Sequence, residues 1–413
     1  MKDFIKQPLY QNSIYQMLSF AINSISGFIF WLIGSRIYPP NIIGINSTLV
    51  SNINLITLIS MIGLNISILK FKEQYKIEEL FGTYLKLLLC NSTVTSTVVI
   101  IILLLTMKEL LYYLPFSIIL FFVITSIFQV TYVFYDSYFL ASNKSKYSLI
   151  SASLASSLKI GLIFITKDID VFGLLLSWGV AIGITILVLS LFFVNFKFLF
   201  SAFITSRVNI RLLKDTFNFS FDNYFATIFY RVPGLLAPTI VAKIVGVEYS
   251  AYLFIAGTFS AIIAMIPKII SQTMLAHVSH DSSKRNALET LFFALILVVI
   301  GIIIIFIFGD FFLNFFGVNY SVYSFKLLML LSLGIFFSVF NFVFIMYKNS
   351  KGESKYAFKL HLIYAITCIP TMIIGVIYIG YLAVGYSILI ANIVEFLAVI
   401  LICLKNRESD LSN

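Results

Sequence analysis

Long runs of apolar residues recur along the whole chain, and short polar segments separate them. A helix that crosses a membrane needs about 20 consecutive, mostly apolar residues. The runs therefore predict twelve spanning helices, near residues 14–34, 44–69, 83–106, 115–140, 148–166, 171–194, 217–241, 249–274, 288–308, 321–347, 357–377 and 382–404. The fold class that this pattern predicts is an all-α polytopic membrane protein.

The composition supports a lipid environment. Of the 413 residues, 60% are hydrophobic and only 11% are charged, whereas soluble proteins have about 45–50% apolar and about 25% charged residues. A soluble domain of this length has too little interior to bury so much apolar surface. The excess apolar side chains are therefore expected to face lipid.

The positive charge of the chain follows the predicted loops. A net charge of +10 is compatible with binding to nucleic acid, but most basic residues gather in alternate segments between the spans. The opposite segments hold only Arg36, Lys108, Lys167 and Lys243. Cytoplasmic loops of membrane proteins are rich in Lys and Arg. We therefore expect both termini to be cytoplasmic, and we expect no nucleic-acid partner.

Two stretches of sequence repeat at about half the length of the chain. Ser145-Lys146-Tyr147 follows the fourth predicted span, and Ser354-Lys355-Tyr356 follows the tenth, 209 residues later. Repeats of six spans each share one orientation in the membrane, and an axis along the membrane normal relates them. The sequence therefore predicts two six-helix lobes with a pseudo-two-fold axis, at residues 1–196 and 215–413, with a cytoplasmic linker at 197–214.

Polar side chains lie at helical spacing inside several spans. The first span carries such a face, and so do the second and the seventh; these residues are Asn12, Gln16, Ser19, Asn23, Ser26, Asn54, Ser220, Asn223 and Thr227. Polar groups at membrane depth face either other helices or water. We expect the Ser and Thr residues to bond between helices, and the faces rich in amides to line a water-filled cavity.

Three cationic residues, Lys159, Arg231 and Lys268, lie inside predicted spans. A charge at the centre of a bilayer costs at least about 2.5–3.5 kcal/mol. Three cations at depth favour an anionic ligand, although they can also reach the interface or pair with carboxylates. Possible partners are Asp136, Asp222 and Glu395, and each is also a candidate for binding a coupling ion.

Motifs of soluble enzymes are absent from the sequence. It contains no phosphate-binding loop, no nucleophile elbow and no metalloprotease helix. His361 lies near the predicted end of a span, which makes it a weak candidate for function. We therefore expect a protein that is not an enzyme, with no cofactor and no metal site.

Three segments, Gly34–Gly44, Gly63–Phe71 and Gly246–Tyr252, and one residue, Arg231, carry a resemblance to a known family. With them the chain resembles the multidrug/oligosaccharidyl-lipid/polysaccharide exporter superfamily, specifically its Wzx-type polysaccharide flippase branch. Gly34–Gly44 resembles the first outer turn of that branch, and Gly63–Phe71 resembles the end of its second span. Arg231 matches a basic residue usual in the seventh span, and Gly246–Tyr252 resembles the turn after it. Tyr230 departs from the pattern, because an acidic residue often precedes that arginine.

The resemblance implies a flippase of the bacterial inner membrane that moves an undecaprenyl-pyrophosphate-linked oligosaccharide, such as an O-antigen or capsule repeat unit, to the outer leaflet. An ion gradient, of H⁺ or Na⁺, would drive alternating access. The polymerase and the chain-length regulator of polysaccharide assembly are candidate partners. The residues that we expect to contact the cargo are Arg231, Lys268, Lys159, Arg36, Asn23, Asn54 and Asn223, and those that we expect to bind the coupling ion are Glu395, Asp222 and Asp136.

Two other functions remain open. A drug or cation antiporter of the same superfamily would share the fold, but such proteins usually carry acidic residues in the cavity of one lobe. A membrane enzyme of polysaccharide assembly, such as a polymerase, would need a long outer loop for its active site. No such loop separates the predicted spans.

Overall fold

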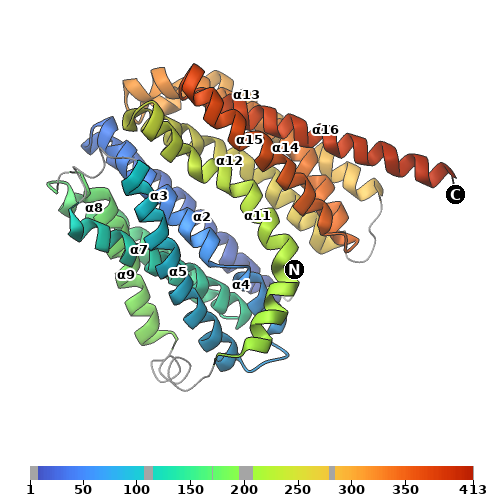
Figure 1. Ribbon diagram of the computed structural model, residues 1–413, viewed down its shortest axis with the longest axis horizontal. Helices are drawn as coiled ribbons and strands as arrows, with labels where there is room; N and C mark the ends of the chain where they lie inside the picture. Colours follow the sequence, from blue (N-terminus) through green and yellow to red (C-terminus); the bar gives the residue numbers. More distant parts are fainter. Residues whose placement is uncertain (1–7, 107–114, 170, 195–207, 279–283, 413) are drawn as a thin grey trace. The chain divides into compact units, whose positions relative to one another are not determined.

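The structure, a computed structural model, describes residues 8–106, 115–169, 171–194, 208–278 and 284–412. Within these ranges it contains thirteen helices and no strand, shown in Figure 1. Twelve helical segments are long and apolar enough to cross a membrane. The predicted class, an all-α protein with twelve spans in two lobes, is confirmed.

The helices of the first half of the chain are α2 (Pro8–Ile37), α3 (Pro40–Ser60), α4 (Leu64–Phe71), α5 (Ile77–Thr106), α7 (Phe116–Ala141), α8 (Lys146–Thr166) and α9 (Gly173–Phe192). Those of the second half are α11 (Ile210–Ile244), α12 (Val247–Val278), α13 (Lys284–Asn314), α14 (Val318–Ser350), α15 (Lys355–Ile379) and α16 (Ala383–Ser412).

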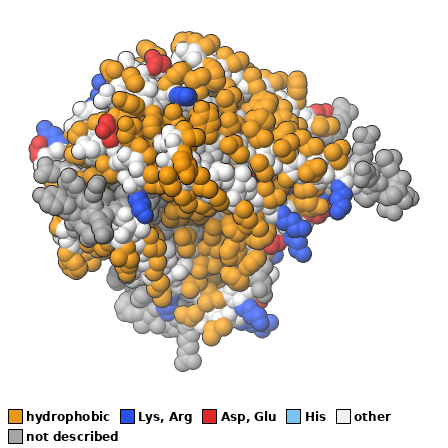
Figure 2. Space-filling view, turned by 45° about the horizontal axis from the view of Figure 1, so that its top comes forward, with side chains coloured by type: hydrophobic (Ala, Val, Ile, Leu, Met, Phe, Trp, Pro, Cys, Tyr) orange, Lys and Arg blue, Asp and Glu red, His pale blue; other side chains and the backbone are white. Residues whose placement is uncertain are grey.

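Large apolar side chains cover much of the surface. Figure 2 shows one face on which hydrophobic side chains dominate. On α13 the exposed residues include Phe292, Phe293, Ile303 and Ile307, which are 50–68% accessible. A soluble protein rarely exposes a contiguous apolar surface of this kind. The surface therefore agrees with burial in lipid.

Contacts divide the chain into two compact units. The first, which we call the N-lobe, comprises residues 1–42 and 49–221, and the second, the C-lobe, comprises 43–48 and 222–413. The sequence places the boundary at 214/215, whereas the contacts place it inside α11. Residues 197–207 of the expected linker lie outside the described residues.

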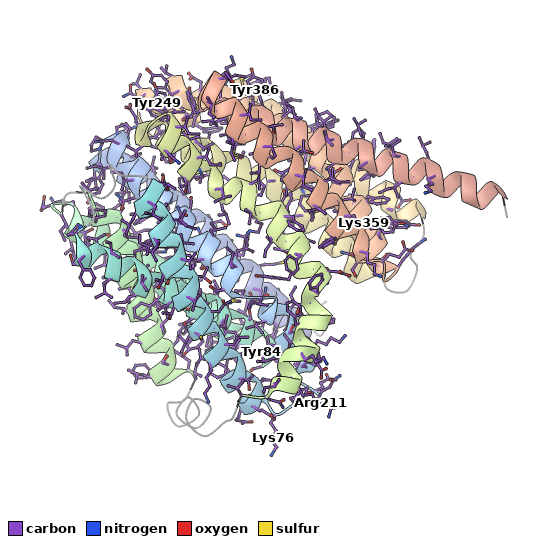
Figure 3. The ribbon with its side chains drawn as sticks, viewed as in Figure 1. Lys76, Tyr84, Arg211, Tyr249, Lys359 and Tyr386 are labelled. Atoms are coloured by element: carbon purple, nitrogen blue, oxygen red, sulfur yellow. The ribbon has the colours of Figure 1, made fainter. Side chains whose placement is uncertain are left out.

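The first three turns of α11 belong to the N-lobe because they hydrogen bond to α5 and the residues beside it. Tyr84 and Thr216 share a buried hydrogen bond of 2.6 Å, and Tyr75 donates to Asp215 at 3.2 Å. The Asn209 amide, just before α11, donates to Glu79 at 2.8 Å. Tyr84 and Arg211 mark this region in Figure 3. Residues 210–214, which the basic charge pattern assigns to the linker, thus belong to a packed helix.

The second span consists of two helices, α3 and α4, although the apolar pattern predicts one. The break falls at residues 61–63, where Ile62 has φ 42° and Gly63 has φ 73°. Glycine adopts this left-handed conformation without steric cost. The apolar run continues across the break, so the pattern alone does not reveal it.

The repeated Ser-Lys-Tyr sequence forms the same turn in each lobe. Asn143 has φ 56° and Gly352, at the lag of 209, has φ 75°. In both turns the next amide bonds to a carbonyl five residues before it: Lys144 to Phe139 at 2.7 Å, and Glu353 to Lys348 at 3.0 Å. The internal repeat therefore extends from sequence to backbone conformation.

Residues 43–48 pack against the start of α12. Thr48 and Ser250 share a buried hydrogen bond of 2.9 Å. A Cβ atom at Gly44 would collide with the carbonyl of Val247. Only glycine permits so close an approach of two helix backbones.

Candidate functional site

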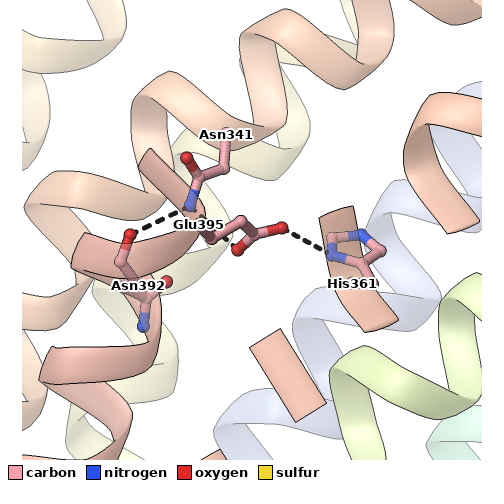
Figure 4. Close-up of polar contacts among 4 residues, drawn as sticks. All are labelled: Asn341, His361, Asn392 and Glu395. Atoms are coloured by element: carbon pink, nitrogen blue, oxygen red, sulfur yellow. Dashed lines mark hydrogen bonds and ion pairs between the residues drawn. The ribbon is translucent and has the colours of Figure 1, made fainter. Parts of the chain in front are cut away.

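A buried network of polar side chains lies in the interior of the C-lobe, contributed by α14, α15 and α16 (Figure 4). Glu395 is 1% exposed, and both of its carboxylate oxygens have nitrogen partners. His361 Nδ1 lies 3.0 Å from Oε1, and Asn341 Nδ2 donates to Oε2 at 2.9 Å. The Asn341 amide also lies 3.4 Å from the carbonyl of Asn392. A buried carboxylate is tolerated in such a place because these contacts replace water.

Aromatic rings enclose this network on the side of α11. The Tyr230 ring lies 4.9 Å from the His361 ring, 5.3 Å from Phe342 and 5.5 Å from Tyr364, measured between centroids. These rings pack around the imidazole. They also connect α11 directly to the network.

Two amide oxygens of the network have no donor. Asn341 Oδ1 and Asn392 Oδ1 are both buried without a hydrogen-bond partner. A buried acceptor without a donor costs about 1–3 kcal/mol. These acceptors could therefore take a hydrogen bond from a further donor, or contact a cation, beside Glu395.

Arg231 and Lys268 lie on α11 and α12 of the same lobe. Both side chains are exposed although both residues lie within candidate spans. Their charges interact with each other. Neither has an acidic partner among the residues that the structure describes. Two cations whose charges interact and that have no carboxylate partner among the described residues form a group that an anion would stabilise.

Lys159 differs from these two cations, because it is buried within the N-lobe. It is 8% exposed, and its Nζ lies 4.6 Å from the ring centroid of Trp178 and 5.6 Å from that of Phe30. Aromatic faces attract a cation through the ring quadrupole. Lys159 thus belongs to the N-lobe, whereas Arg231 and Lys268 belong to the C-lobe.

Two amides of the polar face of α2, Asn12 and Gln16, bond within the N-lobe. Asn12 donates to Asn143 at 3.2 Å and accepts from the amide of Ser145 at 3.1 Å. Gln16 donates to Ser148 at 3.1 Å. These partners lie in the α7–α8 turn and on α8, so the face serves helix packing.

The other predicted cargo residues differ in their exposure. Asn23 and Arg36 of α2 are exposed, whereas Asn54 of α3 and Asn223 of α11 are half-buried. Asn23 lies at the hydroxyl of Tyr132, together with Ser151. Their contact with the cargo stays a prediction.

The three carboxylates expected to bind a coupling ion occupy three different settings. Asp136 is half-buried and interacts with Gln16 and Ser148 in the N-lobe. Asp222 accepts a long hydrogen bond of 3.5 Å from Ser354, at the repeated turn of the C-lobe. Only Glu395 lies in an enclosed network with a titratable partner.

His361 is the functional candidate that sequence reasoning undervalued. Its place near the predicted end of a span suggested an interface, whereas the structure buries it to 8% exposure beside Glu395. A signal was present on α16, where Asn392 and Glu395 are three residues apart and so share a helix face. The pairing of that face with His361 and Asn341 depends on tertiary packing, which no local pattern encodes.

The comparisons with known proteins place the fold. No protein-family model matches the sequence, and no curated protein matches it. Solved structures do match over nearly the whole chain. An inward-facing structure of a multidrug resistance MATE family transporter of the MOP superfamily aligns with a TM-score of 0.73 at 13% identity, covering 96% of this chain and 98% of that one.

Two further structures agree. The lipid II flippase MurJ, in an inward closed conformation, aligns with a TM-score of 0.67 at 15% identity, covering 95% of this chain and 87% of that one. An outward-facing structure of a multidrug resistance MATE family transporter aligns with a TM-score of 0.61 at 14% identity, covering 98% of this chain and 96% of that one. At such identities the likeness establishes the fold.

Proposed function

We propose that this protein is a flippase that moves an undecaprenyl-pyrophosphate-linked oligosaccharide from the inner to the outer leaflet of a bacterial cytoplasmic membrane. An ion gradient drives the movement by alternating access, and both termini face the cytoplasm. The fold supports a transporter, because it is shared with MATE transporters and with a lipid II flippase.

The observation that carries the proposal is the pair of exposed cations at membrane depth, Arg231 and Lys268. A pyrophosphate carries several negative charges, and Arg and Lys are the residues that bind it best. A drug antiporter for cations would gain nothing from this pair, since like charges repel. The pair therefore favours the lipid-linked anion over the cationic drug as cargo.

Glu395 is the residue that we propose binds the coupling ion. It lies in the same lobe as the cation pair, and Tyr230, which precedes Arg231, packs against its partner His361. Tyr230 lies within reach of the charges of both Glu395 and Arg231. One helix, α11, thus contacts both the ion-binding network and the anion-binding pair.

The test replaces the two cations by alanine in cells that display a surface polysaccharide. Arg231→Ala and Lys268→Ala should abolish display while protein levels stay normal, and the lipid-linked oligosaccharide should accumulate inside. Lys359→Ala serves as the control, since this exposed lysine of α15 lies outside the pair. Normal display in both single variants and in the double variant would exclude the pair as the anion site.

A further inference from the structure

We propose that the buried network of the C-lobe is a proton-binding site, in which Glu395 takes up the proton and Tyr230 transmits its presence to α11. The inference rests on the proposed function only in its second half, where the proton is linked to transport. The first half, proton binding, stands on the geometry of the C-lobe alone.

The charge of the network argues for a proton. With His361 neutral, Glu395 and His361 together carry one negative charge, at 1% and 8% exposure. An uncompensated charge inside a protein costs several kcal/mol. One added proton makes the pair neutral and removes that cost without adding any volume to a packed interior.

The hydrogen bonding of Asn341 supplies the place for the proton. Its Nδ2 donates to Glu395 Oε2, while its Oδ1 has no donor. An amide can exchange these two atoms by turning half a revolution. When Oε2 carries the proton, the turned amide accepts it through Oδ1, so the orphan oxygen gains a donor. His361 Nδ1 remains a donor to Oε1.

The same contacts disfavour a sodium ion. Hard cations bind through several oxygen atoms, but nitrogen atoms of His361 and Asn341 occupy both oxygens of the carboxylate.

The surrounding titratable groups do not compete for the proton. On α11 these are Tyr230 and Arg231, and on α15 they are Tyr364 and Cys368. The facing residues of α14 and α16 are the amides Asn341 and Asn392. Tyrosine, cysteine and arginine ordinarily keep their protons until the pH is alkaline, so these neighbours already hold theirs.

Tyr230 connects the network to the part of α11 that can bend. Pro233 and Pro238 lie within the helix, and each removes a backbone hydrogen bond. Tyr230, whose ring contacts His361, lies three residues before Pro233, the first of these prolines. A change at His361 therefore acts on α11 next to Arg231 and just before Pro233, where the backbone hydrogen bonding of the helix is interrupted.

Infrared difference spectroscopy of the full-length protein in lipid tests proton binding without any cargo. The C=O stretch of a buried protonated carboxyl should appear as the pH falls, should be lost in Glu395→Gln and should be kept in Glu353→Gln, whose carboxylate pairs with Lys348. Sodium chloride at constant pH should leave the band unchanged. A titration identical in wild type and Glu395→Gln, or a band removed by sodium, would overturn the proposal.

A second variant keeps the test decisive if Glu395→Gln does not fold. His361→Phe removes a donor to the carboxylate, so the pH dependence of the band should differ from that of the wild type. An unchanged titration in this variant would show that the carboxyl seen is not Glu395.

Transmission through Tyr230 is tested in proteoliposomes, with the lipid-linked oligosaccharide extracted from a strain that lacks the gene as the probe. Tyr230→Leu should keep the carboxyl band but lose the effect of a pH gradient on the probe, and Tyr230→Phe should keep both. A normal gradient effect in Tyr230→Leu would exclude this residue as the link. Failure of the wild type to move the probe would instead refute the proposed function, and the infrared result would be unaffected.

Discussion

Each lobe buries an ionisable side chain, but the two lobes stabilise theirs in opposite ways. In the N-lobe, Lys159 lies against the faces of Trp178 and Phe30. In the C-lobe, Glu395 lies among side chains that exchange hydrogen bonds with it. Aromatic faces can hold a cation but cannot take or give a proton, whereas an imidazole and an amide adapt to a change in protonation.

The repeat makes this difference informative. The turns at Asn143 and Gly352 share their backbone conformation, so the scaffold is common to both lobes. At the same lag of 209, however, Ala152 matches His361, and Lys159 matches Cys368. All four side chains are buried. The two lobes thus share a backbone turn but carry different ionisable residues at equivalent buried positions. We interpret this difference as a difference in function between the lobes.

The largest expected effect comes from removing the carboxylate of the C-lobe. Glu395→Leu leaves His361 Nδ1 without an acceptor and leaves Asn341 Nδ2 only its long contact to the carbonyl of Asn392; a buried group that loses its partner costs about 1–3 kcal/mol. The thermal midpoint in detergent should fall clearly, and uphill transport should be lost. A variant as stable as wild type would mean that the network is not closed around Glu395.

A smaller effect is expected at the shared turn. Gly352→Ala places a Cβ on a residue with φ 75°, which costs about 1–2 kcal/mol. Gly352→Asn should restore most of the stability, because Asn occupies the same position of the N-lobe turn and tolerates this conformation. Thermal unfolding of both variants measures the difference. Equal stability of the alanine and asparagine variants would contradict the equivalence of the turns.

The smallest effect is expected in the N-lobe. Lys159→Met removes a buried amine that has only aromatic contacts among the described residues, and it keeps an unbranched apolar chain. Such replacements are often neutral or stabilising, so the thermal midpoint should be unchanged or higher, with transport retained. Loss of transport by a well-folded Lys159→Met protein would return this lysine to the cargo site.

The fold was largely predictable, since apolar runs report membrane spans directly. The break at Gly63 and the assignment of residues 210–221 to the N-lobe were not, because both depend on contacts that leave hydropathy unchanged. Within the candidate site, Arg231, Lys268 and Glu395 were proposed from the rarity of charge at membrane depth. His361, Asn341 and Asn392 were missed, because amides and histidines are ordinary in a sequence and become informative only when they surround a carboxylate.

The most direct test of the account is the movement of the extracted lipid-linked oligosaccharide in proteoliposomes, with and without an inward pH gradient. We expect wild type to equilibrate the probe between leaflets without a gradient and to accumulate it in the outer leaflet with one. Glu395→Gln should equilibrate the probe but should not accumulate it. Accumulation by Glu395→Gln to the wild-type level would contradict the claim that the C-lobe network couples the proton gradient to transport.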